Sequence, residues 1–112
     1  MNVPEMRAWA AQIKEERRIY SEDENLIHNR ELHRRILTAW RMDSPKMMAR
    51  LERFGMADDL AFVVQERMWR ESDALEKAGY PVTDAREMAE REHLMLEPED
   101  QEEQEEQNPL EM

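Results

Sequence analysis

The stretch LAFVV, residues 60–64, decides the fold expected for this chain of 112 residues. It is apolar on every side, and the sequence continues as QERMW without a glycine or a proline. A helix that is apolar all round is expected to be buried among neighbouring helices. We therefore predict a central helix from about Asp58 to Gly79, where glycine followed by Tyr80 and Pro81 is a typical helix end.

Four further helices are expected around this one. Asn2 can cap the first helix, and SEDE at 21–24 has the pattern of a capping box for the second. SPKMM at 44–48 begins a short third helix, and Thr83 or Asp84 begins the last one. The expected helices span about residues 3–20, 21–41, 44–55, 58–79 and 83–96.

Composition agrees with a single all-α domain followed by a tail. The chain has only two glycines and no cysteine, so disulfides and cysteine-based metal sites are excluded. We predict a helical bundle of four longer helices and one short helix over residues 1–96. Residues 97–112 contain eight acidic and no basic residues, so we predict a disordered acidic tail.

The longest uncharged apolar run, residues 60–64, is far too short to cross a bilayer. The N-terminus has no apolar segment of the kind that a secretory signal requires. These two observations favour a soluble cytoplasmic protein that does not use a membrane.

Polar residues interrupt the apolar stripes of four expected helices. In HNRELH, residues 28–33, the spacing places Asn29 and His33 within the stripe of the second helix. Buried polar groups are usually satisfied by one another, so we predict a core polar network or charged side chains that reach solvent at the rim. The expected pairs are Arg17 with Glu71 or Glu92, and Asn29 with His33. The predicted network comprises Arg17, Asn29, His33, Glu71 and Glu92.

A metal-dependent enzyme is an alternative interpretation of the same residues. Glu71, Glu92 and His33 are metal-ligand types, and EREH at 90–93 has the Glu-x-x-His spacing used in helical metal sites. A dinuclear carboxylate site needs that motif twice, and it occurs here once. The sequence therefore predicts no catalytic residue and no cofactor.

Two surface features favour protein binding instead. Phe62 and Trp69, seven residues apart, form a second aromatic strip on the central helix, which either packs within the chain or binds a partner. The second helix also carries a row of arginines suited to carboxylate or phosphate, namely Arg30, Arg34 and Arg41. Sequence-specific nucleic-acid binding is disfavoured, because the central helix begins with two acids that phosphates would repel.

The predicted function is a non-catalytic adaptor or regulatory protein that binds another protein or forms a homodimer. An alternative is an acidic inhibitor, which would mimic nucleic acid or neutralise a toxin through residues 97–112. The metal-dependent enzyme is the third possibility.

Overall fold

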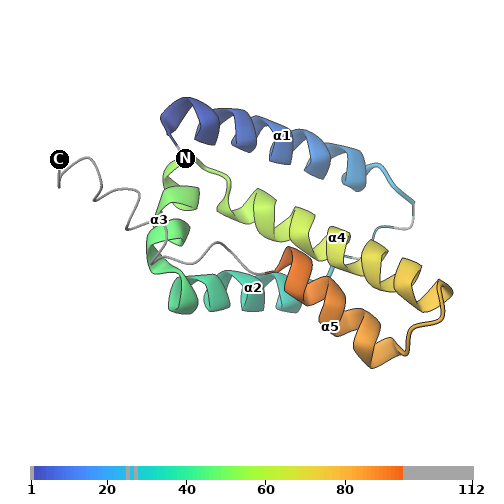
Figure 1. Cartoon of the computed structure of the whole chain (residues 1–112). Helices are drawn as coiled ribbons and strands as arrows, with labels where there is room; N and C mark the ends of the chain where they lie inside the picture. Colours follow the sequence, from blue (N-terminus) through green and yellow to red (C-terminus); the bar gives the residue numbers. More distant parts are fainter. Residues whose placement is uncertain (1, 25, 27, 95–112) are drawn as a thin grey trace.

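The computed structural model describes residues 2–24, 26 and 28–94, and the described residues form five α-helices and no strand (Figure 1). None of these helices combines the length and the apolar character needed to cross a membrane. The predicted all-α bundle of four longer helices and one short helix is confirmed, and the predicted tail, 97–112, lies outside the described residues. The helices are α1 (Val3–Ser21), α2 (Arg30–Asp43), α3 (Pro45–Arg53), α4 (Ala57–Lys77) and α5 (Val82–His93).

Helix α4 runs through the middle of the molecule and packs against each of the other four helices (Figure 1). Residues 60–64 are all buried, as their apolar character predicts. Complete burial of a valine, leucine or phenylalanine side chain contributes about 1.5–3 kcal/mol, so this stretch anchors the core. The other helices supply Met6, Ala10, Ile13, Ile36, Trp40, Met47, Met48, Leu51, Ala85 and Ala89.

Two glycines make the turns on either side of α4. Gly55 and Gly79 have φ values of 67° and 106°, in the left-handed region that L side chains rarely adopt. After Gly79, the Tyr80 N–H donates to the Leu75 carbonyl at 3.1 Å, and Pro81 prevents the helix from continuing. The predicted ends of the third and fourth helices are therefore confirmed.

The start of α2 differs from the prediction. Helix α1 continues to Ser21, whose hydroxyl donates to the Arg17 carbonyl at 2.8 Å, so Ser21 does not cap a second helix. Helix α2 begins only at Arg30, and the Asn29 side chain caps it by accepting the Leu32 N–H at 3.0 Å. The predicted helix from residue 21 is therefore wrong, and Asn29 lies at a helix end rather than within a stripe.

Candidate functional site

The start of α4 is held by a network of ion pairs. The Asp58 carboxylate lies between two partners, with His33 Nε2 2.6 Å from Oδ1 and Arg17 Nη1 donating to Oδ2 at 2.8 Å. Arg17 also donates to Asp59 at 2.7 Å, and Lys14 donates to the other Asp59 oxygen at 2.6 Å. Acids in the first turn also suit the positive end of the helix dipole. We call Lys14, Arg17, His28, His33, Asp58 and Asp59 the Asp58 network.

Phe62 is enclosed by this network. The His28 ring stacks on the Phe62 ring at 4.8 Å between centroids, and the Arg17 guanidinium lies 4.7 Å from the Phe62 centroid. Only 5% of Phe62 is exposed, whereas 47% of Trp69 is exposed. The two residues therefore do not form one exposed aromatic strip, and Phe62 packs within its own chain.

Neighbouring groups within the Asp58 network shift the pKa values of Asp58 and His28. The hydrogen bond from Arg17 holds the pKa of Asp58 below its usual range, with His33 adding to the effect and partial burial opposing it. Burial, followed by the charges of His33 and Arg17, lowers the pKa of His28. His33 is only 8% exposed, and its Nδ1 lies 3.1 Å from His28 Nε2. Both ring nitrogens of His33 are engaged, and the network joins α1, α2 and α4.

Gln65 holds the backbone before α2. Its Oε1 accepts the Asn29 N–H at 2.6 Å, and its Nε2 donates to the Asn29 carbonyl at 3.3 Å. The predicted side-chain pair of Asn29 with His33 is replaced by a backbone bond, in which the His33 N–H donates to the Asn29 carbonyl at 2.9 Å. The role of Gln65 could not be predicted, because a single glutamine that follows the apolar residues 60–64 matches no sequence motif.

A second polar cluster lies between α4 and α5. One ligand-type atom from each of Glu71, Glu92 and His93 lies within 4.8 Å of the other two, and we call these residues the Glu71 cluster. The Glu92 carboxyl is the main cause that raises the pKa of Glu71, and burial adds to it. His93 Nε2 lies 2.5 Å from Glu71 Oε2.

This arrangement corrects two predicted pairings. Arg17 binds Asp58 and Asp59 rather than Glu71 or Glu92. The five predicted polar residues divide among three places: the Asp58 network, the Glu71 cluster and the start of α2, where Asn29 lies. The histidine beside the two glutamates is His93, whereas His33 belongs to the Asp58 network. The metal-site alternative therefore keeps Glu71 and Glu92 but takes a different histidine.

The nearby cation is already bound. Arg67 donates from Nε and Nη2 to the two oxygens of Glu16, each at 2.5 Å, and this fork joins α1 to α4. The Arg67 hydrogen bond lowers the pKa of Glu16, and burial opposes that shift. The Arg67 guanidinium is therefore committed to Glu16.

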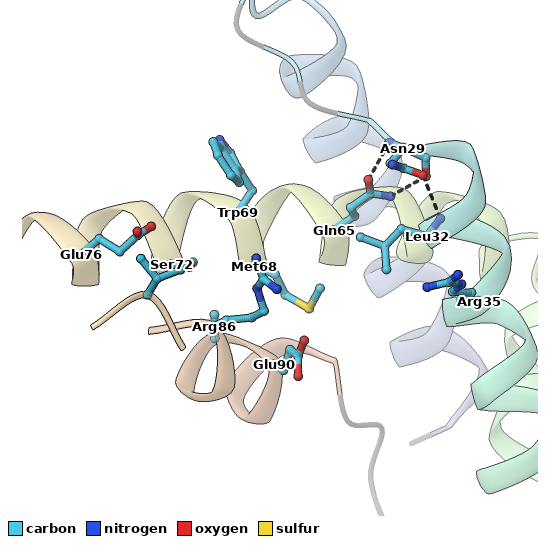
Figure 2. Close-up of a pocket in the computed structure, with 12 residues that line it drawn as sticks. Asn29, Leu32, Arg35, Gln65, Met68, Trp69, Ser72, Glu76, Arg86 and Glu90 are labelled. Carbon is cyan, nitrogen blue, oxygen red and sulfur yellow. Dashed lines mark hydrogen bonds between the residues drawn. The ribbon is translucent and has the colours of Figure 1, made fainter. Parts of the chain in front are cut away.

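A groove of about 610 Å³ opens between α2, α4 and α5 (Figure 2). Met68 and Ala89 are buried along it, and the exposed side chains of Leu32, Trp69 and Val82 line it. Figure 2 shows Trp69 projecting from α4 on the side away from α5. The polar lining consists of Asn29, Arg35, Gln65, Ser72, Glu76, Arg86 and Glu90. Glu90, the first residue of the EREH motif, thus belongs to the groove and not to the Glu71 cluster.

The three predicted arginines all lie exposed on α2. Arg41 Nε is 3.5 Å from Glu52 Oε1 on α3. Arg30 and Arg34 make no ion pair with another residue in the described part of the chain. Among the residues that the structure describes, these two guanidinium groups therefore have no carboxylate partner.

Comparison with protein-family models, curated proteins and solved structures found no match for this chain.

Proposed function

We propose that this chain is a non-catalytic adaptor or regulatory protein, and that it binds an amphipathic helix of a partner protein. The groove between α2, α4 and α5 carries the proposal. Residues of α2, α4 and α5 line it, most of them from α4 and α5 (Figure 2). A groove between helices accepts an added helix that lays its apolar face inside, as in many helix-in-groove complexes.

The apolar lining supplies the expected anchors. Trp69, Val82 and Leu32 are 47%, 57% and 37% exposed, and all three are among the residues that line the groove. Tryptophan is among the residues that contribute most to protein interfaces. Met68 beneath them has a flexible side chain that can adapt to a ligand. The ligand helix would therefore present apolar residues at intervals of three, four and seven.

Charge indicates the flanks of that helix. Arg35 lines the α2 side of the groove and pairs with Glu31 at 2.8 Å, while Arg30 and Arg34 outside the groove add positive charge on the same helix. On the opposite side, Glu76 and Glu90 accompany Arg86. An acidic flank facing α2 therefore gives the best complementarity, and salt should weaken the complex by screening these charges.

Site-specific photocrosslinking tests this proposal. A photoreactive amino acid is placed at Val82 in the groove and, as the matched control, at Ile19 on the exposed face of α1. Irradiation in a lysate of the source cells should capture one protein from position 82 and not from position 19. Peptide mapping of the adduct should place the crosslink in an amphipathic helix of the captured protein.

Affinity measurements with that captured protein complete the test. Trp69→Ala should weaken binding by about 30-fold, the loss typical of a central aromatic anchor. Ile19→Ala should change the affinity by less than twofold. Equal capture from both positions, or an unchanged affinity for Trp69→Ala, contradicts the proposal. Capture of a second copy of this chain would identify the groove as a homodimer interface and overturn the adaptor function.

A further inference from the structure

We infer that the Glu71 cluster binds one divalent transition-metal ion, with Glu71, Glu92 and His93 as its ligands. Two carboxylates and one imidazole supply oxygen and nitrogen donors without sulfur, a set that suits Zn²⁺, Mn²⁺ or Fe²⁺. The imidazole disfavours Ca²⁺ and Mg²⁺, which prefer oxygen ligands alone. None of these three residues lines the groove.

The geometry needs only small side-chain movements. The three ligand-type atoms already lie within 4.8 Å of one another. Bonds of about 2.0–2.2 Å to a tetrahedral ion place its ligand atoms about 3.3–3.5 Å apart. Rotation of the glutamate side chains covers this difference, and the two packed helices fix the backbones that carry them.

One shielded carboxylate oxygen of the cluster is ion-paired but has no aligned hydrogen-bond donor. Glu71 Oε2 is shielded from solvent and has no hydrogen-bond partner, although His93 Nε2 lies only 2.5 Å away. Buried polar atoms are rarely left unsatisfied, so this oxygen is a second observation in favour of a ligand.

The arginine that precedes Glu71 by one turn on α4 binds outside this cluster. Arg67, one turn before Glu71 on α4, makes its fork to Glu16 on α1. Three protein ligands leave at least one position on the ion for water, which is the open arrangement of reactive zinc sites. An ion here would also tie the last turn of α5 to α4.

Titration of the full-length chain with Zn²⁺, after removal of bound metal by a chelator, tests this site. Calorimetry should show one ion per chain, and Zn²⁺ at about a hundred times the dissociation constant should raise the unfolding midpoint by about 10 °C or more. Glu71→Gln, Glu92→Gln and His93→Gln should each weaken Zn²⁺ binding at least tenfold. Glu87→Gln, an exposed change on α5, is the matched control and should bind Zn²⁺ as the parent does.

Histidine NMR distinguishes this site from adventitious binding. The ring signals of His93 should shift on Zn²⁺ addition while those of His28 and His33 stay in place. Ring shifts at His28 or His33 instead, or unchanged Zn²⁺ affinity in folded Glu71→Gln and Glu92→Gln variants, overturn the proposal. Circular dichroism of each variant establishes that it is folded. If one ligand variant fails to fold, the other two and the NMR shifts decide the outcome.

Discussion

The Asp58 network and the Glu71 cluster each place two carboxylates beside histidine, but they differ in charge balance. In the first, two aspartates face Arg17 and Lys14, and His33 completes the contacts. In the second, two glutamates face a single histidine. The pKa of Asp58 is lowered chiefly by Arg17, whereas the pKa of Glu71 is raised chiefly by Glu92. The carboxylates of the Asp58 network are therefore neutralised by cations of the same chain, as in a structural network. Those of the Glu71 cluster have only one histidine, which makes that cluster the candidate ligand site.

Removal of Arg17 should have the largest effect on this contrast. Arg17→Ala leaves Asp58 and Asp59 with less positive charge and uncovers Phe62, so it should lower the free energy of unfolding by about 2 kcal/mol after allowance for partial exposure. Thermal unfolding by circular dichroism should show a midpoint about 10 °C lower. Arg18→Ala, which breaks only exposed pairs with Glu15 and Glu22, is the control and should shift the midpoint by less than 3 °C. If Arg17→Ala and Arg18→Ala shift the unfolding midpoint equally, the Asp58 network does not stabilise the fold.

Asp58→Asn should have an intermediate, pH-dependent effect. Because the folded-state pKa of Asp58 is lowered by Arg17, its contribution is fully present above the unfolded value of 3.8 and is lost as pH falls through the folded value. At pH 7 the free energy of unfolding of the parent should exceed that of Asp58→Asn by about 1 kcal/mol. This value is kept small because the Asp58 carboxylate is largely exposed to solvent. Urea unfolding between pH 2 and 7 should show that this difference in the free energy of unfolding becomes smaller below about pH 4. A gap that is constant down to pH 2 would contradict the prediction.

Glu92→Gln should have the smallest effect and the opposite sign. In a chelator-treated sample it removes one of two neighbouring negative charges, so the free energy of unfolding should rise by about 0.5 kcal/mol. Thermal unfolding at pH 7 measures this as a gain of about 2–4 °C. Glu87→Gln on the same helix should leave the midpoint unchanged. Loss of stability in Glu92→Gln would mean that this cluster, like the Asp58 network, is a structural contact.

The sequence predicts the helices and the polar character of Arg17, His33, Glu71 and Glu92, but it does not predict their partners. Helical periodicity gives the angle at which a side chain leaves its helix, and it gives no position along a neighbouring helix. In the folded chain, Arg17 on α1 lies beside the first turn of α4, which contains Asp58, and not beside the turn that contains Glu71. The pairing therefore depends on tertiary packing.

Local rules fail for the segment before α2 for a different reason. SEDE satisfies the capping pattern, but Ser21 is still within α1, and Asn29 performs the capping at α2. Tertiary contacts favour the later start, because Gln65 binds both backbone groups of Asn29. The groove likewise could not be predicted, since Trp69, Leu32 and Val82 come from three helices.

The attachment of α5 has a consequence for how the molecule responds to ligands. This helix packs mainly on α4, and the turn at Gly79 joins the two. Partial opening of the native state should therefore begin with detachment of α5, whose amides should exchange with solvent sooner than those of α4. Detachment would remove one wall of the groove and two ligands of the Glu71 cluster together. A ligand at either place favours the docked state, so each should increase the affinity of the other by thermodynamic linkage.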